Sequence, residues 1–202
     1  FSFNVARQIN DGIVSTASYY DIVIGANGSS TDLVMSTMFF TGTTTDTISS
    51  EVYEELKNNR DVKELVPFAT GDNYKGSLIV GTEKSFLANK TLKEGKCFEE
   101  YDVAKENGLK IGDKVIGSHG VSETSHSHEN SPYIVVGILE KTHTAYDNTL
   151  FTKIDSVWKT HDKSENSDEE KVDTGLNEEE HNHNHEYTAI LIKTTNPGAA
   201  LN

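Results

Sequence analysis

The stretch that constrains the fold most is an uninterrupted apolar run from Tyr133 to Leu139. It is rich in β-branched residues, follows Ser131-Pro132 and ends before Glu140-Lys141, a pattern that predicts a buried β-strand. The histidines gather around and after this run, because the first 118 residues contain none. They are His119, His126, His128, His143, His161, His181, His183 and His185. This concentration is the main chemical signal in the chain.

Charge is distributed as unevenly as histidine. The chain has 202 residues, a hydrophobic fraction of 35% and a net charge of −14. The segment from His161 to Glu186 holds ten acidic residues and two lysines, which is a net charge of −8. There is no basic patch and no alternation of basic with aromatic residues, which argues against nucleic acid as a partner. A cationic partner, such as a metal ion, fits the charge better.

Cys97 is the only cysteine, so the chain cannot form an internal disulfide or a zinc site built on several thiolates. A transition-metal site would have to use imidazole and carboxylate. No run of about eighteen apolar residues is present. The sequence begins at Phe1 without Met and has no charged stretch before an apolar block, so no signal peptide is expected within it. We expect the sequence to be a piece of a longer protein.

The first half of the chain predicts alternating helices and strands. Phe1, Val5, Ile9 and Ile13 have helical spacing. A strand is expected from Tyr20 to Gly25, and further elements follow it. These are a helix capped by Ser30 or Thr31 and running to about Phe39, a helix at 51–59 capped by Ser49 or Ser50, and strands at 62–68 and 77–82 around a turn at 71–73. This order is typical of an α+β sandwich.

After Phe86 the pattern changes to short strands and turns. The expected elements are a turn at 92–95, a brief helix at 103–109, strands at 114–117 and 150–154, a helical turn at 154–161 and a last strand at 187–193. The low-complexity acidic stretch 162–180 is expected to be a solvated loop. Asn196-Pro197 has the order of a helix start. A domain held between two membrane helices would look like this.

Several glycine-containing motifs occur together in a fixed order. They are Gly25-Ala-Asn-Gly-Ser-Ser30, Gly71-Asp-Asn-Tyr-Lys-Gly76, Ile79-Val-Gly-Thr82, Leu109-Lys-Ile-Gly-Asp113, Gly117-Ser-His-Gly120, Val135-Val-Gly-Ile138, and Asp147 followed by Trp158-Lys-Thr-His161. As an ordered set, from about Tyr20 to Thr194, they resemble the MacB-like periplasmic core domain. This is the extracytoplasmic domain of ABC transporter permeases in the MacB, lipoprotein-releasing and FtsX-like superfamily.

The resemblance implies one extracytoplasmic domain over residues 1–202. An α/β lobe is expected at about 14–85 and 140–195, a smaller and mostly β lobe at about 86–139, and an acidic, histidine-rich loop at 162–186. In one place the sequence departs from its relatives. They carry an additional strand after a Gly-x-x-Phe turn, whereas here Gly95-Lys-Cys-Phe98 runs directly into Asp102-Val-Ala104. Either the strand is absent or residues are missing there.

The resemblance also implies a place and a task. The domain would lie outside the bacterial cytoplasmic membrane, in the periplasm or on the outer face, and would join the transmembrane helices of the permease. A separate ATP-binding subunit would drive motion that acts on an external cargo or partner protein. No phosphate-binding Gly-x-x-x-x-Gly-Lys motif is present, consistent with an ATPase on another chain.

The histidine tracts are candidate metal ligands. His181, His183 and His185 alternate with asparagine, so in an extended chain they would share one face about 6.6–6.8 Å apart. His126 and His128 have the same spacing. Imidazole suits zinc, copper and nickel, and nearby carboxylates raise its basicity. The alternative is that these tracts are solvated loops without a ligand.

Two further histidines are candidates because of the resemblance. His119 in its tight turn, and His161 together with Asp147, match a subset of the family. A structural role, with the imidazole bonded to a backbone carbonyl, is the alternative for both. His143 has no distinguishing context and is assigned a structural role. The candidate zinc ligands are therefore His119, His126, His128, His161, His181, His183 and His185, and no cofactor is required.

The patterns expected of an enzyme fail. His128 is followed by Glu129-Asn130, which breaks the histidine pattern of a zinc hydrolase, and Ser118 does not lie in a Gly-x-Ser-x-Gly elbow. We therefore interpret the chain as a non-enzyme. Three hypotheses remain: a mechanically coupling permease domain, the same domain linked to zinc, and a stand-alone zinc-binding or metal-scavenging protein.

Overall fold

The computed structural model describes residues 19–40, 46–88, 90–97, 102–104, 108–118, 132–142, 144–165, 185–196 and 198. The described helices are α2 (Ser30–Met38), α3 (Ser50–Lys57), α4 (Lys84–Leu87), α5 (Ile154–Glu165) and the 3-10 helix η1 (Ala145–Asn148). The strands are β1 (Ile22–Gly25), β2 (Val62–Tyr74), β3 (Ser77–Thr82), β4 (Leu92–Gly95), β5 (Asp102–Ala104), β6 (Lys114–Val115), β7 (Tyr133–Leu139), β8 (Thr149–Lys153) and β9 (Ala189–Thr194). The fold is α+β, as predicted.

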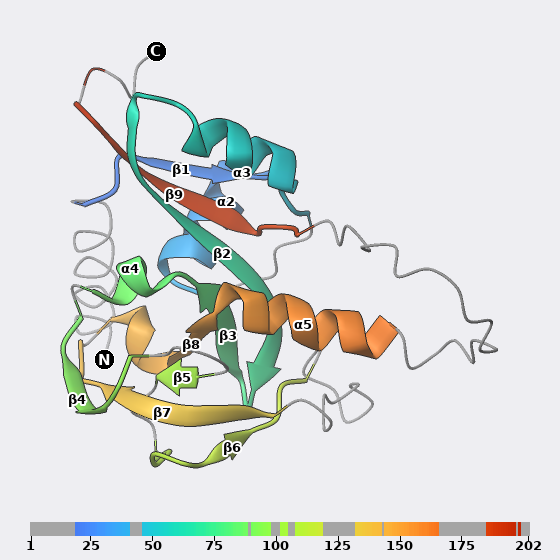
Figure 1. Ribbon diagram of the computed structural model, residues 1–202, viewed down its shortest axis with the longest axis vertical. Helices are drawn as coiled ribbons and strands as arrows, with labels where there is room; N and C mark the ends of the chain where they lie inside the picture. Colours follow the sequence, from blue (N-terminus) through green and yellow to red (C-terminus); the bar gives the residue numbers. More distant parts are fainter. Residues whose placement is uncertain are drawn as a thin grey trace.

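The described strands form one sheet in the order β1-β9-β2-β3-β8-β5-β7-β4, with β6 also paired to β7 (Figure 1). The pairs β3–β8 and β5–β7 are parallel, and the others are antiparallel. The long strand β2 joins the part of the sheet that contains β1 and β9 to the part that begins with β3, because Val62–Phe68 pairs with β9 and Ala69–Tyr74 pairs with β3. The predicted strand Tyr133–Leu139 is confirmed as β7.

Side chains cover both faces of β1, of residues 65–69 in β2 and of residues 189–192 in β9, which explains why apolar residues follow one another there. Successive side chains of a strand point to opposite faces. Val23, Val66, Phe68 and Leu191 join a cluster with Leu33 and Met38 of α2. Ile22, Ile24, Leu65, Ile190 and Ile192 join a second cluster with residues of α3 and α5. Helices therefore cover both faces of this part of the sheet.

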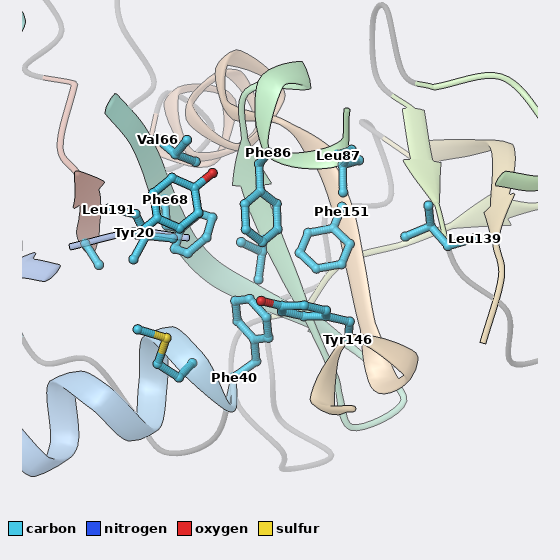
Figure 2. Close-up of a cluster of buried hydrophobic side chains, with 13 residues drawn as sticks. Tyr20, Phe40, Val66, Phe68, Phe86, Leu87, Leu139, Tyr146, Phe151 and Leu191 are labelled. Carbon is cyan, nitrogen blue, oxygen red and sulfur yellow. The ribbon is translucent and has the colours of Figure 1, made fainter. Parts of the chain in front are cut away.

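Aromatic side chains dominate the first cluster (Figure 2). The ring of Phe86 meets Phe68 edge to face, with centroids 5.0 Å apart, and contacts Phe151 at 5.6 Å. Phe40 reaches the same rings from the end of α2, 5.8 Å from Phe68 and 5.5 Å from Tyr146. Edge-to-face contacts of this kind add to the stabilisation that burial already provides.

The predicted turn at 71–73 is wrong. β2 continues to Tyr74, and one extra residue between Thr70 and Asn73 is accommodated as a β-bulge. The chain reverses at Lys75 and Gly76, both of which have positive φ angles, 49° and 79°. Two successive residues in this conformation favour a tight hairpin turn. The sequence prediction placed the turn too early because Gly71-Asp72-Asn73 also has the composition of a turn.

Two predictions for the middle of the chain are also corrected. Residues 92–95 form β4 instead of a turn, because they pair with β7. Asp102–Ala104 forms β5 instead of the start of a helix, since it pairs with β7 and β8. Whether the additional strand of the relatives is absent, or residues are missing there, stays open. In each case pairing with a buried strand outweighs local propensity.

The remaining boundaries shift slightly. Ser29 caps α2, one residue earlier than predicted, and its hydroxyl accepts a hydrogen bond from the Asp32 amide at 3.2 Å. Ser49 is the N-cap of α3. The helix α5 extends to Glu165, four residues into the segment predicted to be loop from Asp162. The predicted helix at 1–13 and the helix start at Pro197 lie outside the described residues.

No helix in the described ranges has both the length and the apolar character needed to cross a membrane. The predicted division into an α/β lobe and an inserted β lobe stays a prediction.

Candidate functional site

Four aromatic rings form a continuous ladder between α3, α5 and the residues that lead into β9. Tyr53 of α3 stacks on Tyr187, with ring centroids 4.7 Å apart. Tyr187 meets Trp158 of α5 edge to face at 5.4 Å. Trp158 in turn stacks on His185, with centroids 4.0 Å apart and ring planes within 1° of parallel. We call these four residues the ring ladder; it runs from half-buried Tyr53 to exposed His185.

Backbone contacts fix the ladder in place. Tyr187 exchanges two backbone hydrogen bonds with Ile48, at 2.7 and 2.9 Å. The indole Nε1 of Trp158 donates to the Glu186 carbonyl oxygen at 3.0 Å. Gly81 of β3 allows α5 to lie close to the sheet, since a Cβ atom there would stand 2.7 Å from a Val157 methyl group. The rings are therefore held by the sheet and by α5 together.

Carboxylates from several elements surround the ladder. The Tyr53 hydroxyl donates to Glu83 Oε1 at 3.0 Å, just before α4. Glu186 Oε2 accepts a hydrogen bond from the Thr47 hydroxyl at 2.6 Å. Two other carboxylates pair with lysines: Asp155 with Lys153 at 2.7 Å and Glu54 with Lys57 at 3.4 Å. The environment of the rings is thus negatively charged.

The tyrosine hydroxyls respond to this charge. Burial, and then Glu54, Glu83 and Asp155, raise the pKa of Tyr187 to about 12. Burial and the Glu83 carboxylate likewise raise the pKa of Tyr53. Both phenols therefore stay neutral near pH 7 and act as hydrogen-bond donors. They are unsuited to act as bases or nucleophiles.

One cation already lies over the ladder. The ammonium nitrogen of Lys57 is 5.8 Å from the centroid of the Tyr53 ring. A cation at this distance from a ring face is attracted by the negative potential of its π-electrons. The site can therefore hold a positive charge against an aromatic face.

A second polar cluster lies where the bulge of β2 meets the end of β6. The carboxylate of Asp72 is fully buried beside Gly117 and the Tyr133 phenol. Burial, with the adjacent carboxylate, raises the pKa of Tyr133. Asn73 and Ser118 exchange two backbone hydrogen bonds, both 3.0 Å long. These contacts hold Gly117 and Ser118, the first two residues of the Gly117-Ser-His-Gly120 motif, against the sheet.

Among the candidate metal ligands, the structure describes the side chain of His185 only. It stacks on Trp158, one helical turn before His161, whose backbone belongs to α5. The other candidates, His119, His126, His128, His181 and His183, lie outside the described residues, as does His143. Within the described ranges, no three His, Cys, Asp or Glu side chains are grouped so that they could hold a metal ion. The metal hypothesis stays a prediction.

Asp147, which the sequence pattern grouped with His161, has a structural contact. Its Oδ1 accepts hydrogen bonds from the Thr142 amide at 2.8 Å and the Thr142 hydroxyl at 2.7 Å. This carboxylate therefore closes the turn that leads into η1 (Ala145–Asn148).

Sequence reasoning missed Tyr53, Glu83 and Tyr187 as parts of a site. The spacing of Tyr53 and Leu56 could have indicated the inner face of α3, since residues three apart share one face. No local pattern joins Tyr53 to Glu83, 30 residues later, or to Tyr187. Only the sheet order β9-β2-β3 brings their three segments together.

Comparison with known proteins gives a likeness in fold. No protein-family model matches the sequence, and no curated protein matches it. The crystal structure of the periplasmic region of MacB from Actinobacillus actinomycetemcomitans is similar, with 13% identity, a TM-score of 0.50, and coverage of 92% of this chain and 79% of that one. The extracellular domain of the noncanonical ABC-type transporter YknZ from Gram-positive bacteria has 12% identity, a TM-score of 0.49, and coverage of 86% and 82%.

Proposed function

We propose that this chain, which has the fold of a MacB-like periplasmic core domain, is the extracytoplasmic domain of an ABC transporter permease. In this role it transmits motion, driven by a separate ATP-binding subunit, to a cargo or partner protein outside the membrane. The observation that carries the proposal is the match to the periplasmic region of MacB over 92% of the chain. The ordered glycine motifs of the sequence point in the same direction.

The architecture suits a mechanical task. The 13-residue strand β2 pairs with β9 along its first half and with β3 along its second, so one covalent element connects the two parts of the sheet. Buried clusters on both faces of β2 hold it rigidly. A displacement applied at the β9 end is therefore expected to reach the β3 end with little loss.

The chemistry of the ring ladder favours binding over catalysis. Its two tyrosines have raised pKa values and stay protonated. Hydrogen-bonded aromatic rings beside carboxylates recognise a ligand without requiring it to react. We therefore assign the domain a non-enzymatic role.

The test is the position of the domain in the full-length protein. Glu55 is exposed on α3, so a Glu55→Cys substitution in a full-length background whose own cysteines, Cys97 included, are replaced by serine gives a defined labelling position. A membrane-impermeant maleimide should label it in intact cells, or in cells whose outer membrane alone is permeabilised. An ATP-binding subunit should co-purify with the same full-length protein. Labelling only after lysis of the cytoplasmic membrane would contradict the proposal.

A second candidate adds zinc to this function. It is favoured by the stack of His185 on Trp158, because Trp158 and His161 are neighbours one turn apart on α5. The stack covers one face of the imidazole, whereas a metal binds through nitrogens on the ring edge, so the two contacts are compatible. If the full-length protein lacks transmembrane helices and still binds zinc tightly, the third hypothesis, a stand-alone metal-binding protein, replaces the first two.

A further inference from the structure

We propose that the ring ladder and the carboxylates beside it bind an arginine side chain in a basic segment of an extracytoplasmic partner protein. The partner's location rests on the proposed function, whereas the binding chemistry rests on the residues of this surface alone. The surface comprises the exposed or half-buried rings of the ladder (Tyr53, Trp158 and His185), the buried Tyr187 beneath them, and the carboxylates of Glu54, Glu83, Asp155 and Glu186.

Charge is the first argument. Among the described residues, Glu83 and Glu186 each accept a hydrogen bond from a hydroxyl group but pair with no lysine or arginine. Glu54, Glu83 and Asp155 act together on one phenol, that of Tyr187. They come from three separate segments, so the fold concentrates negative charge at this point. Glu54 and Asp155 also form exposed ion pairs with Lys57 and Lys153, so Glu83 and Glu186 carry the charge that an incoming cation meets first.

The rings are the second argument. Lys57 of this chain already places its ammonium group 5.8 Å from the Tyr53 ring centroid. Its ion pair with Glu54 is exposed, with 58% of each side chain accessible to solvent. Exposed pairs of this kind contribute little free energy, so an incoming cation can displace Lys57 at small cost. The lysine therefore occupies the position of the ligand that we propose.

The shape of the surface selects arginine over a metal ion. Within the described part of the chain, the acidic and histidine side chains do not converge on a single point. A guanidinium group is planar, stacks on aromatic faces and donates several hydrogen bonds in fixed directions. It can stack on a ring and reach Glu83 or Asp155 with the same side chain. A lysine is expected to bind more weakly because it lacks the planar stack.

Trp158 makes the test direct, because it is the only tryptophan of the chain and lies in the ladder. The purified domain is titrated with a short peptide that contains two arginines, and Trp158 fluorescence is recorded. The matched probe is the same peptide with citrulline in place of arginine, which keeps the shape and removes the charge. Only the arginine peptide should change the fluorescence in a saturable manner, and its affinity should fall as salt is added.

The variant Glu83→Gln/Asp155→Asn removes two negative charges. Its glutamine side-chain oxygen can still accept the hydrogen bond from the Tyr53 hydroxyl. We expect the variant to bind the arginine peptide with an affinity about tenfold lower, a difference of about 1.4 kcal/mol in binding free energy. The matched control is Glu55→Gln, an exposed acid on the same helix as Glu54 that is not among the carboxylates raising the pKa of Tyr53 or Tyr187. It should bind like the wild type. Urea unfolding of each variant shows whether the fold is intact.

Equal binding of the citrulline peptide, or equal loss in Glu55→Gln and in the double variant, would overturn the proposal. A fluorescence change with Zn²⁺ and none with the arginine peptide would make this surface a metal site instead. These outcomes are separate from the permease assignment. Failure of peptide binding leaves the labelling of Glu55→Cys unchanged, and an intracellular label leaves the peptide affinity unchanged.

Discussion

The carboxylate of Asp72 lies directly against the Cα atom of Gly117. A methyl group at Gly117 would stand 2.7 Å from Asp72 Oδ2 and 3.0 Å from its Cγ. Asp72 is fully buried, so it cannot move into solvent to make room. This contact joins the bulge of β2 to the chain beyond β6, next to the Asn73–Ser118 hydrogen bonds. Glycine is required there for space, and not for an unusual backbone angle.

Gly117→Ala should therefore lower the free energy of unfolding by about 1–3 kcal/mol, the usual cost of overpacking a buried site. Gly28→Ala is the matched control, because a Cβ atom at Gly28 meets no atom within 4 Å. Urea unfolding followed by circular dichroism measures both. A loss below about 0.5 kcal/mol for Gly117→Ala, equal to that of an ordinary surface change, would show that Asp72 can shift.

Asp21 makes part of the stability of the fold depend on pH in the acid range. Its carboxylate accepts hydrogen bonds from the Thr194 amide at 2.8 Å and hydroxyl at 2.7 Å, and pairs with Lys193 at 3.1 Å. These contacts, the Thr194 amide first, lower the pKa of Asp21 from 3.8 to about 2. A carboxylate with a lowered folded-state pKa stabilises the protein above its unfolded pKa and loses that contribution as the pH falls toward its folded pKa.

The stability difference between wild type and Asp21→Asn should therefore be largest near about pH 5 and shrink as the pH falls to about 2. Urea midpoints measured across this range test the prediction. Asp61→Asn, an exposed aspartate at the start of β2, serves as the control. A difference that stays constant with pH would mean that the amide oxygen of asparagine replaces all that the carboxylate does.

Buried strands were predictable because both faces of the sheet are covered. The runs Leu78-Ile-Val80 and Ala189-Ile-Leu-Ile192 are apolar at every position, and each became a strand. The starts of α2 and α3 were predictable to within one residue because a serine stands at each N-cap position, Ser29 and Ser49. Local signals suffice for elements that carry their own pattern.

Elements that depend on distant partners could not be predicted. Asp102-Val-Ala104 has no strand pattern of its own and is a strand because it pairs with β7 and β8. The ring ladder has the same origin, since Tyr53 and Tyr187 are far apart in sequence and meet through β9 and β2. The composition of the histidine tracts predicted a site there, whereas the site in the described residues consists mainly of tyrosine, tryptophan and glutamate side chains.

The zinc hypothesis predicts a specific calorimetric result. Titration of the metal-stripped domain with Zn²⁺ at about pH 7.4 should show micromolar or tighter binding with a defined stoichiometry, with Mg²⁺ and Ca²⁺ as controls. The affinity should fall as the pH drops through about 6.5, because imidazole ligands must be neutral. A combined His181→Ala, His183→Ala and His185→Ala variant should lose most of the binding.

Unchanged affinity in that variant would move the site to His119, His126 and His128. Weak binding at many sites, or none, would leave the tracts as solvated segments and the domain as a mechanical coupler. The His185→Ala single variant adds a local readout, because the fluorescence of Trp158 should respond to Zn²⁺ only when its stacked imidazole is a ligand.

Lys90 is held over the aromatic cluster of Figure 2, and its charge is costly there. Its ammonium nitrogen lies 4.7 Å from the centroid of Tyr146 and 4.9 Å from that of Phe86. Burial lowers the pKa of Lys90, so the unfolded chain binds the proton more tightly than the folded one. Stability should therefore rise as the pH increases through the lowered pKa toward 10.5.

Lys90→Met keeps the apolar stem and removes the buried charge, while the thioether retains a favourable contact with the rings. We expect the free energy of unfolding at neutral pH to rise by up to about 1 kcal/mol. The substitution removes the cost of burying the ammonium charge, and this gain exceeds the cation–π attraction that is lost with it. Lys84→Met, an exposed lysine on α4, should change it by less than about 0.5 kcal/mol. The rise in stability at alkaline pH should also disappear in Lys90→Met. A loss above about 1 kcal/mol would instead mean that the two rings stabilise the ammonium group more than burial destabilises it.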